Sequence, residues 1–169
     1  MEEQDALYQR AATEFGASLA RLARGYETDS EQQRDLLQDM HFALWRSLAT
    51  FNGQCSLRTW IYRVAHNVAI STRLRRRARR TQLVGLDELV ETADNEDIEQ
   101  ISSEHQLLSQ LQMLIRRLKP PDDQVMLLYL EDLDATAISE ITGLSPGAVA
   151  TRIHRAKALL ARRFRGESS

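Results

Sequence analysis

Residues 134–155, DATAISEITGLSPGAVATRIHR, decide how the sequence is interpreted. Asp134 is well suited to cap a short helix, which Gly143 ends because glycine adopts the left-handed backbone of a helix end without strain. Ser145 is expected to cap the next helix, and Pro146 occupies its first position, where a backbone N–H is not needed. The spacing predicts two helices joined by a tight turn, the helix-turn-helix arrangement.

The two faces of the second helix differ in chemistry. Val149, Ile153, Ala156 and Leu160 recur in steps of four, three and four, which predicts one buried stripe. Small residues at the start of the opposite face let a backbone approach DNA closely, and arginine pairs with guanine in the major groove. The candidate DNA-reading residues are Ser145, Gly147, Ala148, Thr151, Arg152, His154 and Arg155. An ordinary helical hairpin is the alternative.

Residues 143–147 also match G-x-S-x-G, the hydrolase nucleophile elbow. That motif uses the backbone N–H after the serine to stabilise an oxyanion, and Pro146 has none. We therefore interpret the match as part of the helix-turn-helix and expect no enzyme, no catalytic residue and no cofactor.

Composition excludes several other classes. Seven glycines and three prolines among 169 residues argue against a turn-rich all-β protein. The single Cys55 excludes an internal disulfide and a cysteine-based zinc site, and the four histidines lack metal-ligand spacing. No apolar run approaches the roughly 20 residues that a membrane span needs. The acidic N-terminus lacks a signal-peptide pattern, so we expect a cytoplasmic all-α protein.

Charge is strongly segregated, although the net charge is only −2. Residues 58–86 hold eight arginines and no acid, residues 87–104 hold eight acids and no base, and residues 141–165 hold six bases and no acid. Two basic blocks separated by an acidic one indicate two surfaces for a polyanion. Solvated helix faces are the alternative, but such faces normally mix both signs.

Helical periodicity divides the chain into two helical domains. We expect three helices in residues 1–81, with Gly25 ending the first, Ser30 capping the second and Ser56 capping the third. Residues 82–104 are expected to form an acidic linker. Residues 105–169 are expected to form a four-helix domain that contains the helix-turn-helix, with Asp122 capping its second helix.

Aromatic and polar side chains precede the arginine run of the third helix. Trp60, Tyr62, Arg63, His66 and Asn67 lie just before residues 73–80. Aromatics beside arginines can stack unpaired bases and hold a strand backbone. Taken alone, Trp60 is more often a core residue than a base platform.

At three places the sequence resembles the bacterial extracytoplasmic-function (group four) sigma factors of the sigma-70 family. The matching stretches are residues 35–39 with 43–46, residues 56–69, and residues 144–156. They occur in the family's order, on both sides of residues 82–104.

The resemblance implies a role for each region. The first domain would bind the β′ clamp helices of core RNA polymerase and open the −10 element of promoter DNA, with the loop at residues 52–55 capturing a flipped base. The second domain would bind the β flap and read the −35 element, and an anti-sigma factor or other regulator is a further expected partner. The implied polymerase-binding residues are Asp35, Gln38, Asp39, Trp45 and Arg46. The implied residues for the −10 element are Asn52, Gln54, Cys55, Arg58, Trp60, Tyr62, Arg63, His66, Asn67, Arg75 and Arg76.

The chain departs from the family pattern in two places. The family usually carries more acids just before Asp35, where this chain has Gln32-Gln33-Arg34. Ala148 and Ala150 replace larger polar residues of the reading helix, which leaves Arg152 and Arg155 as its chief side chains. An autonomous helix-turn-helix regulator and a protein-binding adaptor remain alternatives. A free-standing regulator has no need of the strand-melting helix of the first domain.

Overall fold

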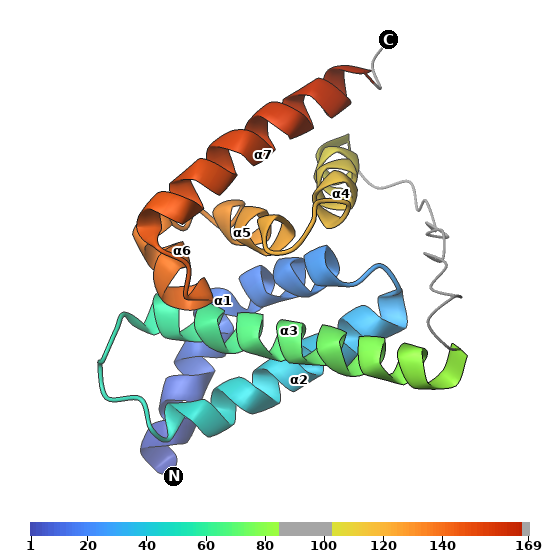
Figure 1. Cartoon of the computed structure of the whole chain (residues 1–169). Coiled ribbons are helices and arrows are strands. Elements are labelled where there is room, and N and C mark those ends of the chain that lie inside the picture. Colours follow the sequence, from blue (N-terminus) through green and yellow to red (C-terminus); the bar gives the residue numbers. More distant parts are fainter. Residues whose placement is uncertain (85–102, 167–169) are drawn as a thin grey trace. The chain divides into compact units, whose positions relative to one another are not determined.

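The computed structural model describes residues 1–84 and 103–166, which form seven helices and no strand (Figure 1). The prediction of an all-α chain with two helical domains is confirmed. Residues 85–102, most of the predicted acidic linker, lie outside the described residues. The helices are α1 Glu2–Tyr26, α2 Ser30–Leu48, α3 Leu57–Val84, α4 Ser103–Arg116, α5 Asp122–Tyr129, α6 Ala135–Thr142 and α7 Pro146–Gly166.

Contacts divide the chain into two compact units. Of the described residues, the first contains 1–54 and 64–84, and the second contains 55–63 and 103–166. The family-like domain boundaries predicted from the sequence, 1–81 and 105–169, are not tested by this division and stay predictions.

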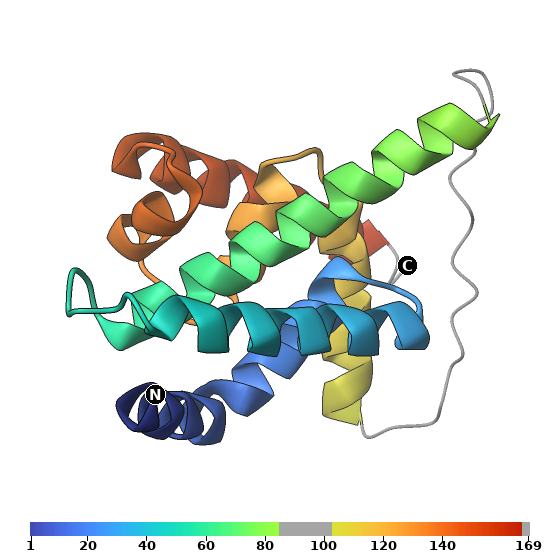
Figure 2. The ribbon, with the colours of Figure 1, turned by 90° about the horizontal axis from the view of Figure 1, so that it is seen from below.

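In the first unit α1 and α2 lie side by side and run in opposite directions (Figures 1 and 2). Every fourth residue of α2 is buried, and matching residues of α1 close the core from the other side. These buried residues are Leu36, Met40, Leu44 and Leu48 on α2 and Ala11, Leu19, Leu22, Ala23 and Tyr26 on α1. Each is at most 4% exposed, so the pair encloses a continuous apolar core.

Two expected helix ends in this unit are wrong. Gly25 does not end α1, which runs on to Tyr26, and Gly25 is itself buried inside the helix. Asp29, not Ser30, caps α2: its carboxylate accepts a hydrogen bond from the Gln32 N–H at 2.9 Å. The predicted cap of α3 is confirmed, because the Ser56 hydroxyl accepts from the Thr59 N–H at 3.1 Å.

The second unit packs α4, α6 and α7 around the short helix α5. α5 is buried along most of its length, and α7 is the long helix that follows α6 at one end of this unit (Figure 1). Its core comprises Leu114, Ile115, Leu118, Val125, Met126, Leu127, Leu128, Leu133, Ile138, Ile141, Val149, Ala156 and Leu160. Asp122 does not cap α5 as expected: Pro121 holds the cap position, and Asp122 is the first helical residue.

Candidate nucleic-acid and polymerase interfaces

The turn between α6 and α7 has the geometry that the sequence predicts. The Asp134 carboxylate accepts from the Ala137 N–H at 2.8 Å and so caps α6. Gly143 ends α6 with φ +84°, a backbone that L side chains rarely adopt, and its N–H donates to the Ser139 carbonyl. Ser145 then caps α7 by accepting from the Ala148 N–H at 3.1 Å. The turn is therefore fixed by backbone conformation at one residue and by a hydroxyl cap two residues later.

The outer face of α7 is exposed at most of the predicted DNA-reading positions. Ser145, Gly147, Thr151, His154 and Arg155 are exposed, and Ala148 is half-buried. The inner stripe of Val149, Ala156 and Leu160 is buried, as expected, while Ile153 is half-buried. In the first turn of α7 the Ala148 and Val149 N–H groups are bonded to Ser145, which leaves the Gly147 N–H beside small side chains to meet a phosphate or a base edge.

Arg152 differs from the other residues of this face. Its guanidinium donates to the carboxylate of Asp122, at the start of α5, at 2.6 Å, and both side chains are about one-third exposed. Sequence reasoning missed this pair, because the two residues lie 30 positions apart. The pair neutralises one of the two arginines that were expected to read bases.

The loop before α3 is built around Gln54. Its side-chain oxygen accepts from the Asn52 N–H at 2.9 Å, and its Nε2 donates to the Thr50 carbonyl at 3.2 Å. Gly53 has φ +83°, so the loop reverses at a residue that tolerates this backbone. The side chain of Asn52 is exposed, and Cys55 is a half-buried free thiol. Of the loop residues expected to bind a base, Asn52 is the one best placed to meet a ligand.

The predicted strand-contacting residues of α3 fall into exposed and buried sets. Arg58, Asn67 and Arg75 are exposed, whereas Tyr62 and His66 are only 2% and 6% exposed. The remaining three, Trp60, Arg63 and Arg76, are half-buried. The burial of Tyr62 and His66 favours a packing role for both, because a base platform must be open to a base.

His66 is enclosed beside the end of α1. Its Nδ1 shares a hydrogen bond with the Tyr26 hydroxyl at 3.0 Å. Burial, and secondarily the positive charge of Arg73, lowers the pKa of His66 from 6.5 to about 4. The imidazole is therefore neutral at physiological pH and adds no charge for a phosphate.

The predicted polymerase-binding residues lie mostly on the outer face of α2. Asp35, Gln38, Asp39 and Arg46 are exposed at helical spacing. Trp45 is half-buried and is tied to α1, because its Nε1 donates to the Asp5 carboxylate at 2.8 Å.

Phe42 was missed by sequence reasoning. This side chain is 60% exposed on the same face of α2, and the Arg46 guanidinium lies 5.7 Å from its ring centroid. Its position four residues before Arg46 and three after Asp39 is the signal that could have identified it. The face thus combines two acids, an exposed aromatic ring and a cation.

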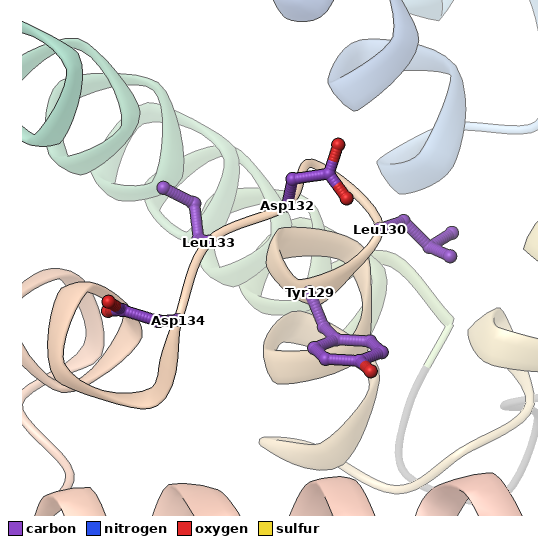
Figure 3. Close-up of a pocket in the computed structure, with 5 residues that line it drawn as sticks. All are labelled: Tyr129, Leu130, Asp132, Leu133 and Asp134. Carbon is purple, nitrogen blue, oxygen red and sulfur yellow. The ribbon is translucent and has the colours of Figure 1, made fainter.

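A hollow of about 370 Å³ lies at the turn between α5 and α6, lined by Tyr129, Leu130, Asp132, Leu133 and Asp134 (Figure 3). Asp134 already caps α6, and the Tyr129 hydroxyl accepts from the Lys157 ammonium at 3.1 Å. Two of its three polar side chains are therefore engaged in holding the fold, and the hollow offers no set of convergent free groups.

Other kinds of site find no support in the described part of the chain. Within residues 1–84 and 103–166, no group of three or more His, Cys, Asp or Glu side chains is placed to hold a metal ion. No helix in the same residues is long and apolar enough to cross a membrane.

The exposed helix-turn-helix and the arginine-rich helix α3 are features of a helical DNA-binding protein. Family models agree with this class: Sigma-70 region 2 matches residues 12–80, and Sigma-70, region 4 matches residues 108–160. The chain belongs to the sigma-70 family of RNA polymerase sigma factors. As members of this family do, it acts with core RNA polymerase and promoter DNA.

Individual relatives fit this assignment. RNA polymerase sigma factor YlaC of Bacillus subtilis is 30% identical over 75% of this chain and 74% of its own length. The ECF RNA polymerase sigma-E factor of Haemophilus influenzae is 30% identical over 75% of this chain and 71% of its own.

Solved structures show the same fold at lower identity. Sigma factor RpoE of Bartonella quintana, solved with the anti-sigma factor NepR, superposes with a TM-score of 0.76 at 17% identity, over 94% of this chain and 96% of that one. CnrH, solved with the cytosolic domain of CnrY, gives 0.67 at 22% identity, over 94% and 88%.

Proposed function

We propose that α7 reads the −35 element and that the loop at residues 52–55, with α3, opens the −10 element. The observation that carries the first assignment is the exposed outer face of α7, which begins directly after the fixed turn at Gly143. Its small residues and the Gly147 N–H suit close approach of the α7 backbone to DNA. Arg155 lies one helical turn beyond Thr151 and is exposed on the same face.

The −10 assignment rests on the loop and on the cationic end of α3. Asn52 presents an exposed amide, which can donate to and accept from a base edge. Exposed arginines follow along α3 and supply positive charge for a strand backbone. A flipped base needs a pocket that offsets the few kcal/mol of unstacking, and the loop is the region where the family pattern places one.

The outer face of α2 is our candidate contact with the β′ clamp helices. Asp35, Gln38 and Asp39 offer polar contacts, and Phe42 offers an apolar anchor of the kind found at the centre of protein interfaces. We propose that the second unit meets the β flap, and that residues 82–104 join the two DNA surfaces as a linker.

Regulation by a protein partner also belongs to this proposal. Two solved structures with this fold contain a bound protein: the anti-sigma factor NepR in one and the cytosolic domain of CnrY in the other. We propose that a regulator of this kind covers one of the surfaces described above, and that the chain acts as a non-catalytic factor in the cytoplasm, where polymerase and DNA are found.

The test combines core polymerase capture with run-off transcription. We expect the chain to co-purify with core polymerase and to direct specific transcripts that core polymerase alone does not make. An autonomous regulator would bind duplex DNA specifically without polymerase, and an adaptor would bind protein without directing transcripts. Either of these two results would replace the proposed function.

A further inference from the structure

Two of the α3 arginines continue the inward face of that helix. Tyr62, His66, Ala69, Arg73 and Arg76 follow one another in steps of four, three, four and three, which keeps them on one side of a helix. The first three are buried, and the two arginines are half-buried. The same stripe that packs α3 therefore extends into the arginine run.

Arg73 lies against the last residue of α1. Its guanidinium carbon is 4.8 Å from the centroid of the Tyr26 ring, and its Nη2 donates to the Tyr26 carbonyl at 3.4 Å. Tyr26 in turn holds His66 through its hydroxyl. Arg73 thus belongs to a packed cluster that joins α1 to α3.

Arg76 closes the same cluster from the next turn of α3. Its Nη1 lies 2.6 Å from the Glu27 carboxylate and donates to the Gln32 side-chain oxygen at 3.0 Å. The Glu27 side chain is only 9% exposed. Gln33 reaches back to the Glu27 and Thr28 carbonyls, at 2.9 and 3.3 Å. The glutamines that replace acids of the family pattern are therefore engaged in the α1–α2 turn.

The other arginines of the run have a different environment. Arg75, Arg77, Arg79 and Arg80 are all exposed. None of the four makes an ion pair or a side-chain hydrogen bond to another residue of the described chain. They are available to a phosphate, whereas Arg76 is already paired.

Moving Arg76 onto DNA would be costly. It would leave the Glu27 carboxylate buried and without its cation, and an uncompensated buried charge is strongly unfavourable. The exposed arginines can bind a phosphate without leaving such a charge behind.

We propose that Arg73 and Arg76 are positioning residues that lock α3 to the α1–α2 turn, with Glu27 as the ionic partner, while Arg75, Arg77, Arg79 and Arg80 hold the melted promoter strand. This inference rests on the proposed −10 function of α3. It replaces the expectation that Arg76 contacts DNA. The arginines on the inward face of α3 would hold the fold, and those on the exposed face would bind DNA.

A charge exchange tests the positioning role. Glu27→Gln and Arg76→Gln are each expected to slow −10 opening about tenfold or more. Arg76→Gln leaves the buried Glu27 carboxylate without its cation, and Glu27→Gln removes the anion that holds the half-buried Arg76 guanidinium. The double variant Glu27→Arg with Arg76→Glu restores the ion pair with reversed polarity, and rotation of the Gln32 amide gives the carboxylate introduced on α3 a donor. We expect the double variant to open within about threefold of wild type.

Opening is followed by 2-aminopurine fluorescence in the −10 region, with polymerase holoenzyme, at a temperature where circular dichroism shows every variant folded. Polymerase affinity, measured alongside, is expected to be unchanged. A double variant that opens more slowly than either single variant would show that position 76 needs a positive charge for DNA, and would overturn the proposal.

Salt dependence gives a second readout that does not require the double variant to fold. Arg75→Gln is expected to reduce the slope of log K for promoter binding against log salt by about 0.7, the value for one phosphate contact on a single strand. Arg76→Gln is expected to leave the slope unchanged. An equal reduction in both variants would overturn the division of the run.

The experiments distinguish failure of the positioning role of Arg76 from failure of the proposed −10 function of α3. If the wild-type holoenzyme opens promoters and Arg76→Gln lowers the salt slope, the positioning role is wrong and the proposed function stands. If the wild-type holoenzyme opens no promoter, the proposed −10 function is wrong, and the positioning role is lost with it.

Discussion

Arg152 on α7 and Asp122 at the start of α5 form an ion pair with a separation of 2.6 Å. The pair ties the middle of the proposed reading helix to the helix beneath it. It also leaves Arg155, one turn further along, as an exposed arginine on the outer face. The two arginines that look equivalent in the sequence therefore have different expected roles.

We expect Arg155→Ala to weaken binding to the −35 element by about 1–3 kcal/mol and to relax preference at one base pair, as loss of a bidentate base contact does. Arg152→Ala is expected to cost about 0.2–1 kcal/mol of folding stability, the range for a partly exposed ion pair, with a smaller effect on base preference. Competition binding of holoenzyme to −35 variants, with thermal unfolding of each protein, measures both.

Asp122→Asn is the control for this pair, because it releases Arg152 without removing it. We expect the stability cost of Arg152→Ala to be reproduced and base preference to be retained. If Arg152→Ala relaxes base preference at the −35 element and Arg155→Ala leaves it unchanged, Arg152 and not Arg155 reads the base.

Gly143→Ala is expected to destabilise the second unit by about 1–2 kcal/mol, because the new side chain is forced into the left-handed backbone at φ +84°. Gly147→Ala is the matched control. Gly147 has no such backbone, and nothing lies within 4 Å of its added Cβ, so we expect a gain of about 0.5 kcal/mol from helix propensity. Chemical denaturation measures the change in the free energy of unfolding for each variant, which we expect to fall for Gly143→Ala and to rise for Gly147→Ala. An equal change in the two variants would contradict the role of Gly143 in the turn.

The lowered pKa of His66 leads us to expect that the protein loses folding stability at acid pH. The unfolded chain takes up this proton near pH 6.5, whereas the folded chain resists it until about pH 4, so acidification favours unfolding across that window. The pKa difference corresponds to on the order of 3 kcal/mol. The positive group facing the imidazole is Arg73, and its hydrogen-bond partner is the Tyr26 hydroxyl.

The measurement is the free energy of unfolding from pH 7 to pH 4 for wild type and His66→Gln. Burial also lowers the pKa of His41, but that contribution is common to both proteins. We expect the difference between the two proteins to change by a few kcal/mol in the direction that favours His66→Gln at low pH. Parallel curves would show that His66 is not the titrating group.

Asn52→Ala is expected to change −10 base preference and to reduce open-complex formation, while leaving polymerase binding intact. The exposed amide takes no side-chain part in the loop's hydrogen bonds, so its loss is expected to spare folding. Gln54→Ala should instead loosen the loop, because Gln54 makes both of the side-chain hydrogen bonds that shape it. Permanganate footprinting of the −10 region separates these effects, and normal opening with unchanged preference in Asn52→Ala would leave the loop as a plain turn.

The parts of the fold that sequence predicts well depend on neighbouring residues. Asp134, Gly143 and Ser145 act within three or four positions of themselves, and all three have the roles that their residue types suggest. The cap of α2 was misplaced by one residue because Asp29 and Ser30 are both good capping residues, and only the backbone shows which carboxylate or hydroxyl reaches the Gln32 N–H.

The interactions that sequence could not reveal join distant positions. Arg76 and Glu27 lie far apart in the chain. The sequence of residues 73–80 does not show which arginine pairs with the buried Glu27 carboxylate and which arginines face water. Glycine is a common helix-ending residue, but Gly25 lies buried within α1, which ends one residue later at Tyr26. The residue types of α3 predict a positively charged helix, and tertiary packing determines which of its arginines stay exposed.

The most direct test is selection from a randomised promoter library, transcribed by core polymerase with and without the chain. We expect two separated motifs to be enriched only when both proteins are present. Arg155→Ala should relax the upstream motif alone, and Asn52→Ala the downstream motif alone. A single motif, bound equally well by the chain without polymerase, would contradict the account and support an autonomous DNA-binding regulator.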